Sequence, residues 1–203
     1  MSEPADPLAS HRRNELALLF DISLILDRSL DLRDEVGAIL RALAKHTGMV
    51  RGTLTLLNRE TDEILIEEGH GLSAKQRERT RYRPGEGVTG MVIQTGRPMV
   101  IPRISEEPLF LDKTGARSKM RKDEIAFVCV PIKIENEVLG ALSADRIYHE
   151  PVSLDEDLHL LSIIARMIAQ AVQLRRKALE DQQRLIDQNK RLQQELQDRF
   201  RPA

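Results

Sequence analysis

Three glycines between residues 85 and 90 form the pattern Gly-x-Gly-x-x-Gly. In nucleotide-binding proteins this pattern lets backbone amides approach a pyrophosphate, and it requires a buried strand before it and a helix after it. Here the preceding residues 79–84, Arg-Thr-Arg-Tyr-Arg-Pro, are cationic and end in proline, unlike a buried strand. The glycines therefore predict a turn that opens a short helix, and they disfavour a nucleotide site.

Arginines near this turn are candidates for binding a small anionic ligand, because a guanidinium group matches a carboxylate bidentately. Two of them precede the glycines and one follows the helix, while a glutamate and a threonine lie at the junction of turn and helix. The alternative is that the arginines are surface charges paired with neighbouring glutamates. The candidate ligand-binding residues are Arg81, Arg83, Arg103, Glu86 and Thr89.

The other reactive residues indicate neither an enzyme nor a metal site. The five histidines include no His-x-x-x-His pair, and neither Gly-x-Ser-x-Gly nor Gly-x-x-x-x-Gly-Lys-[Ser/Thr] occurs. The single cysteine, Cys129, lies in an apolar stretch without a neighbouring cation, which favours an inert core thiol over a redox sensor. The acidic runs at 106–107 and 155–157 are typical of a solvated loop and a helix N-terminus.

Composition narrows the class of protein further. The 203 residues, 41% of them hydrophobic and 31% charged, predict one globular domain of about 150 residues with extensions. The net charge of −1 and the 3% of aromatic residues disfavour nucleic-acid binding. Without a signal-like segment or a run of about twenty apolar residues, we expect a cytoplasmic protein that does not contact the membrane.

The elements around the glycines predict an α+β fold with a central antiparallel sheet flanked by helices. Residues 14–30 and 32–46 read as helices, and alternation predicts strands at 53–57 and 63–67 and a hairpin over 125–145. We expect a ligand to lie between this sheet and the segment 83–112. The alternative is that Leu109, Phe110 and Leu111 fill that space themselves.

A long helix follows Ser153, which begins a Ser-x-x-Glu capping box. From Ala178 onward apolar residues recur in alternating steps of four and three, with an Asn at an a position, which predicts a parallel two-stranded coiled coil; a solvated single helix is the alternative. Apolar side chains cover more of the helix at 14–30 than packing on one domain would bury, so we expect this helix to contact a second chain as well. The predicted dimer interface comprises Leu16, Leu19, Ile164, Ile168, Leu185, Asn189, Leu192 and Leu196.

Four segments in order carry a family resemblance: Arg-Tyr-Arg-Pro-Gly-Glu-Gly-Val-Thr-Gly from residue 81, Pro-Arg-Ile-Ser-Glu-Glu-Pro-Leu-Phe-Leu-Asp from 102, Phe-Val-Cys-Val-Pro-Ile-Lys from 127 and Leu-Gly-Ala-Leu-Ser from 139. Together they resemble the GAF domain of NifA-type, sigma-54-dependent activators of nitrogen fixation. The domain organisation expected is a disordered tail at 1–13, a GAF domain at 14–175 and a coiled-coil linker at 176–203.

The resemblance implies a regulatory sensor rather than an enzyme. It implies a homodimer that binds an effector such as 2-oxoglutarate, or an inhibitory NifL-type protein, and signals through its last helix to an AAA+ domain of the same protein. One alternative is a ligand-free module for dimerisation or partner docking. Another is a relative of the methionine sulfoxide reductases, which the single Cys129 disfavours.

Overall fold

The protein is built around a six-stranded antiparallel sheet with the strand order β3-β2-β1-β6-β5-β4. The computed structural model describes residues 7–28, 32–118, 120–121, 124–147 and 153–199. Both predicted hairpins are present, and the predicted α+β class is confirmed. The strands are β1 (Arg51–Asn58), β2 (Glu63–His70), β3 (Arg81–Tyr82), β4 (Met99–Ile101), β5 (Ile125–Ile134) and β6 (Glu137–Ile147).

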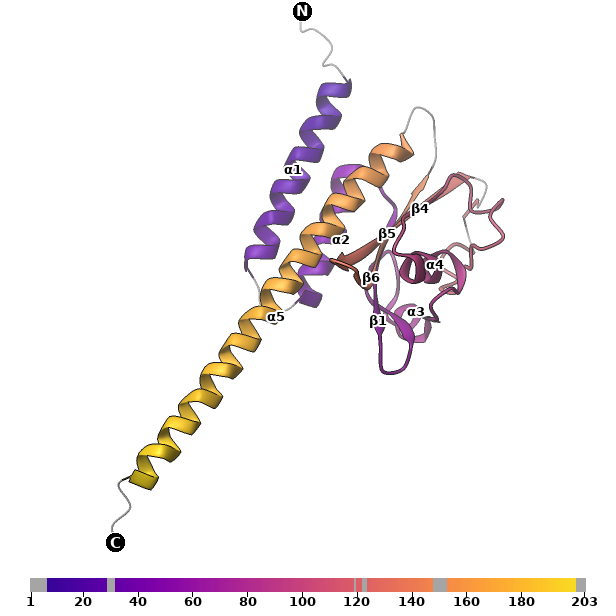
Figure 1. Cartoon of the computed structure of the whole chain (residues 1–203). Coiled ribbons are helices and arrows are strands. Elements are labelled where there is room, and N and C mark those ends of the chain that lie inside the picture. Colours follow the sequence, from indigo (N-terminus) through magenta and orange to yellow (C-terminus); the bar gives the residue numbers. More distant parts are fainter. Residues whose placement is uncertain (1–6, 29–31, 119, 122–123, 148–152, 200–203) are drawn as a thin grey trace, which may run out of the picture.

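Three long helices lie together on one face of the sheet, and the shorter helices lie beyond its other side (Figure 1). Charge supports the helix ends, since α2 has Asp34 and Glu35 in its first turn and Lys45 and His46 in its last. A capping box of Ser73 and Gln76 opens α3, with both of its hydrogen bonds formed. The helices are α1 (Pro7–Arg28), α2 (Leu32–Thr47), α3 (Ala74–Arg79), α4 (Gly87–Thr95) and α5 (Leu154–Arg199).

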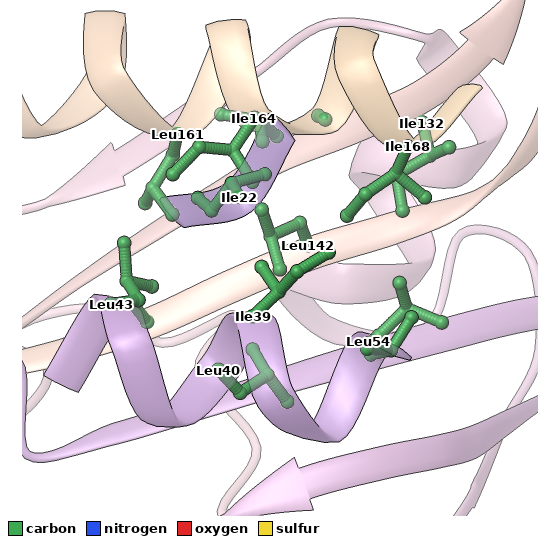
Figure 2. Packing of buried hydrophobic residues seen from close by; sticks show 14 of the residues in the cluster. Ile22, Ile39, Leu40, Leu43, Leu54, Ile132, Leu142, Leu161, Ile164 and Ile168 are labelled. Carbon is green, nitrogen blue, oxygen red and sulfur yellow. The ribbon is translucent and has the colours of Figure 1, made fainter. Parts of the chain in front are cut away.

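Strand alternation divides the buried residues into two hydrophobic cores. In β5 and β6, Ile132 and Leu142 point toward the long helices, where they pack with Ile22, Ile39 and Leu161 (Figure 2). Alternate residues of the same two strands point to the opposite face, toward α4 and the segment that follows β4. This second core includes Tyr82, Val88, Ile93, Phe127, Cys129 and Ala141.

Two expectations about the N-terminal half need correction. Helix α1 begins at Pro7, so the predicted disordered tail over 1–13 is wrong from that residue onward, and residues 1–6 lie outside the described part of the chain. Proline suits the first helical position because its fixed φ is already helical and no N–H bond is lost there. The cationic stretch before the glycines contains the short edge strand β3, in which Arg81 is exposed and Tyr82 is buried.

Helix α5 has two halves with different surroundings. Its first half packs on the sheet, and its second half extends past the domain (Figure 1). Ile164 and Ile168, both predicted at a dimer interface, are 0% and 1% exposed because they belong to the domain's own core. That part of the interface prediction is wrong, since these side chains have no surface left for a second chain. Leu185, Leu192 and Leu196 are 67%, 53% and 55% exposed.

Candidate ligand site beneath the 105–118 lid

The three glycines form a tight turn whose backbone groups bond to one another. The amide of Gly85 donates to the carbonyl of Gly90 at 2.9 Å, and the amide of Gly90 donates to Glu86 at 3.1 Å. A Cβ at Gly90 would lie 2.4 Å from the carbonyl oxygen of Arg83, so only glycine fits. Gly87 has φ +64° and lies against Leu111. The glycines therefore serve chain packing, as predicted, and the amides of Gly85 and Gly90 are already occupied.

A small cavity lies between the sheet and residues 105–118, which we call the lid. Its volume is about 30 Å³, the space of a single water molecule, whereas ligand pockets usually measure about 300–1,000 Å³. A small molecule therefore requires the lid to move. The cavity is lined by Thr53, Thr55, Ile66, Tyr82, Val88, Thr89, Phe110, Leu111, Thr114, Arg117, Phe127 and Ser143.

Lid side chains occupy part of the space that a ligand would need. The ring of Phe110 packs edge-on against Phe127, with 5.1 Å between ring centroids and 74° between planes. Leu109 and Leu111 remain 45% and 38% exposed. In the alternative stated above, lid side chains fill the cavity themselves. Phe110 does so in part, whereas Leu109 does not.

The floor of the cavity is polar although it belongs to the sheet. The hydroxyls of Thr53 and Ser143 are 2.6 Å apart across the β1–β6 pair. The hydroxyl of Thr55 donates to the carbonyl of Ala141 at 3.2 Å. Buried hydroxyls can turn to donate or accept, so this floor offers hydrogen bonds to a polar ligand.

The lid places a buried guanidinium group, that of Arg117, in the cavity wall. Arg117 is 7% exposed, and its Nε and Nη2 donate to the two carboxylate oxygens of Asp145 at 2.8 and 2.7 Å. Its Nη1 donates to Asp112 at 3.2 Å. The guanidinium carbon lies 4.9 Å and 5.6 Å from the ring centroids of Phe110 and Phe127, within cation–π distance.

Charges around Arg117 keep it ionised despite its burial. Burial lowers the pKa of Arg117, but the charges of Asp145 and Asp112 and their hydrogen bonds outweigh it, so the pKa is raised. Asp145 is 1% exposed and has a second cation nearby, because Arg51 Nη1 lies 3.5 Å from its Oδ2. The site therefore contains a buried carboxylate between an arginine of the sheet and an arginine of the lid.

The predicted ligand arginines lie elsewhere. Arg81, Arg83 and Arg103 do not line the cavity. Arg103 forms a surface ion pair with Glu106 at 3.1 Å, which is the kind of pairing expected under the surface-charge alternative.

The two other predicted ligand residues, Glu86 and Thr89, both lie within the glycine turn. Glu86 pairs with Lys113 of the lid, and the hydrogen bond from Lys113 lowers the pKa of Glu86. Thr89 lines the cavity, so it is the only one of the five predicted ligand residues that does.

Arg117 and Asp145 were missed in the sequence for different reasons. Arg117 lies in a charged, turn-rich loop, and no sequence pattern there distinguishes a buried arginine from an exposed one. Asp145 did carry a signal, because an aspartate at the end of an apolar strand requires a buried partner.

The remaining titratable groups of this core are unreactive near neutral pH. Burial raises the pKa of Cys129 to about 12, against a smaller lowering by its hydrogen bond with Thr89. Burial also raises the pKa of Tyr82 to about 12. The thiol is therefore protonated, in agreement with the prediction of an inert core cysteine.

Metal-binding clusters and membrane-spanning helices are absent from the described ranges. No three histidine, cysteine or acidic side chains there are grouped to bind a metal ion. None of the helices described above combines the length and apolar character needed to cross a membrane.

Curated relatives resemble this chain over most of its length. The nitrogen fixation protein VnfA of Azotobacter vinelandii is 38% identical over 97% of this chain and 38% of its own length. The Nif-specific regulatory protein of Azospirillum brasilense is 36% identical over 90% of this chain and 29% of its own. The chain thus spans about a third of the length of these relatives.

Solved structures share the fold at lower identity. The GAF domain of A. aeolicus nlh2 in an inactive state superposes with a TM-score of 0.72 at 23% identity, covering 81% of this chain and 99% of that one. The free methionine-R-sulfoxide reductase of Neisseria meningitidis gives 0.68 at 19% identity, covering 88% and 97%. The GAF domain family model matches residues 31–172, and the chain belongs to the GAF domain family.

Proposed function

We propose that this chain is the regulatory sensor domain of a transcriptional activator of nitrogen-fixation genes, and that it binds a small carboxylate effector such as 2-oxoglutarate beneath the lid. The observation that carries the proposal is the buried guanidinium of Arg117 above a floor of hydroxyl groups. The context comes from relatives named as nitrogen-fixation regulators, which match at least 90% of this chain at 36–38% identity.

Helix α5 provides the output in this proposal. It begins at Leu154, packs on the sheet and continues beyond the domain (Figure 1). We propose that an effector domain follows it in the longer protein. In a longer protein of the NifA type that domain is a sigma-54-dependent AAA+ ATPase. The names of the relatives describe regulators, which agrees with the expectation that the chain is not an enzyme.

A homodimer forms part of the same proposal, and it is supported by apolar side chains exposed on two helices. On α1, Leu16 and Phe20 are largely exposed, while Leu19 is half-buried against the core. On α5 the exposed leucines continue to Leu196, with Asn189 at the central a position. A NifL-type inhibitory protein is a further proposed partner, and it would dock on the same domain.

Thermal unfolding with candidate effectors tests the sensor proposal. We expect 2-oxoglutarate at a hundred times its Kd to stabilise the chain by about 2.7 kcal/mol, with cyclic nucleotides and nucleoside triphosphates as comparison ligands. Substitution of Arg81, Arg83 or Arg103 by alanine then tests whether the exposed arginines contribute to binding. Stabilisation by none of the anionic compounds would refute the effector part of the proposal.

The alternative function, a ligand-free module for dimerisation or partner docking, is favoured by one observation. The cavity measures about 30 Å³ and Phe110 occupies part of it. This alternative predicts that the dimer mass measured by light scattering is retained while calorimetry detects no small-molecule binding.

A further inference from the structure

Beside the packing of Phe110 on Phe127, several charged side chains hold the lid to the sheet, and these must rearrange before a ligand can enter. Arg117 donates two hydrogen bonds to Asp145 of β6. Arg51 of β1 donates to the carbonyl oxygen of Ala116 at 2.7 Å. Lys113 donates to the carbonyl oxygen of Arg81 at 2.9 Å. Of the residues in these contacts, only Arg117 lines the cavity itself.

The guanidinium group of Arg117 has one edge bound to the lid and one edge bound to the sheet. Its Nη1 contacts Asp112 and Thr114, which belong to the lid and move with it. Its Nε and Nη2 face Asp145, which belongs to the sheet. When the lid moves, this second edge is the one that loses its partner, and it has the geometry that binds a carboxylate bidentately.

Asp145 keeps a cation when the lid moves. Arg51 Nη1 lies 3.5 Å from Asp145 Oδ2, and Arg51 belongs to β1, which pairs with β6 at Arg51 and Asp145 themselves. A buried carboxylate without a partner is strongly unfavourable, so a resident second arginine removes the main obstacle to releasing Arg117. The two arginines thus allow Asp145 to change partners without becoming unpaired.

We propose that an effector carboxylate replaces Asp145 as the bidentate partner of Arg117, and that Asp145 then forms its ion pair with Arg51 alone. This inference rests on the proposed function, because it assumes a carboxylate effector beneath the lid. In the closed state Asp145 occupies the place of the effector carboxylate and competes with it. Arg117 is then the residue that selects anionic ligands, in place of the exposed arginines at 81, 83 and 103.

The competition predicts opposite effects for the two partners of the pair. Asp145→Asn keeps the shape of the side chain but removes the competing charge, so affinity for a carboxylate should rise at least tenfold. Arg117→Lys keeps the positive charge but cannot form two parallel N–H bonds, so affinity should fall at least tenfold. Arg103→Lys, at the exposed pair with Glu106, is the matched control and should leave affinity unchanged.

Isothermal titration of the full chain with 2-oxoglutarate, succinate and glutamate measures these affinities. The uncharged dimethyl ester of 2-oxoglutarate is the control probe. Hydrogen exchange of residues 105–118 without any probe should be faster in Asp145→Asn than in the wild type, because the lid has lost its charged partner. Circular dichroism confirms that each variant is folded.

The outcomes separate this inference from the proposed function. If the wild type binds a probe and folded Asp145→Asn binds it no more tightly, partner exchange is refuted and the sensor proposal stands. If only Asp145→Asn binds, partner exchange stands and the wild type is not a sensor of these compounds. If neither binds, both proposals fail.

A measurement on the wild type covers the case in which Asp145→Asn does not fold. The Nε–H signal of Arg117 in a 15N-arginine NMR spectrum, assigned by its loss in Arg117→Lys, should shift on saturation with 2-oxoglutarate. An unchanged signal in the saturated protein would refute the exchange of partners.

Discussion

Asp145 and Arg146 are neighbours in β6, and their side chains form buried ion pairs on opposite faces of the sheet. Asp145 pairs with Arg117 of the lid, whereas Arg146 pairs with Asp157 in the first turn of α5. Successive side chains of a strand point to opposite faces, so one dipeptide contacts both the lid side and the helix side. This part of β6 therefore links the lid to the start of α5.

The pair on the helix side should make a large contribution to stability. We expect Arg146→Met to destabilise the protein by about 3–5 kcal/mol, because it removes the guanidinium group that pairs with the buried carboxylate of Asp157. The double variant Arg146→Met/Asp157→Leu should recover part of that loss, since neither charge then remains. Urea unfolding measures both values. As a control, Arg103→Met at the exposed pair with Glu106 should cost less than about 1 kcal/mol.

The glycine turn gives a second prediction about stability. Gly90→Ala should strongly destabilise the fold, because the new methyl group would meet the carbonyl of Arg83 at 2.4 Å. Gly115→Ala is the matched control. Gly115 has φ +63° with no other atom within 4 Å of the added Cβ, so only conformational strain of about 1–2 kcal/mol is expected. Equal thermal shifts for the two variants would show that the close approach is not limiting.

Alkaline pH should destabilise the protein through Cys129. The thiol of an unfolded chain ionises at about pH 8.5, whereas burial raises the pKa of Cys129 to about 12 in the folded state. The contribution to stability is therefore complete below pH 8.5. Above it the unfolded state releases a proton that the folded state retains, so stability falls by up to about 1.4 kcal/mol per pH unit.

The comparison with Cys129→Ala isolates this effect. Urea unfolding at about pH 8 and about pH 10 should show a larger loss for the wild type than for the variant. Tyr82, whose pKa is also raised to about 12 by burial, contributes equally to both proteins above its unfolded pKa of about 10. Parallel pH profiles for the two proteins would contradict the raised pKa of the thiol.

Two neighbouring positions of α1 should respond differently to a charge. Phe20 is 63% exposed and Ile22 is fully buried. We expect Phe20→Asp to lower the mass measured by light scattering toward that of a monomer while the circular dichroism spectrum stays unchanged. Ile22→Asp should unfold the domain, because it buries an unpaired carboxylate. A Phe20→Asp protein that remains as dimeric as the wild type would exclude this face from the interface.

Truncation after Arg176 should separate folding from association. The buried residues of α5 end before this point, and all its exposed leucines except Leu174 follow it. We expect the shortened chain to keep its melting temperature at high dilution, where association does not contribute, and to dimerise more weakly in sedimentation experiments. Loss of the folded state would mean that the distal half of α5 is needed by the domain.

The sheet and helices were predictable because each element has a strong local pattern. The alternation of 53–67 and the apolar run of 125–134 depend on neighbours in sequence, and both predicted hairpins are present. Ile164 and Ile168 were assigned to the wrong contact because an apolar helix face looks the same whether it meets its own domain or a second chain. The partnership of Arg117 with Asp145 joins residues 28 positions apart, and only the folded sheet brings them together.

The two halves of helix α5 are in a fixed rotational register. The heptad positions of Leu185, Leu192 and Leu196 continue those of Leu161, Ile164 and Ile168, which the domain's own core holds in place. The domain therefore fixes the direction in which the distal leucines point around the axis of α5. Inserting one residue after Val172 would turn them by about 100°, whereas inserting seven would return them to within about 20°. If α5 transmits a signal as proposed, the length of this stretch should matter as much as its side chains.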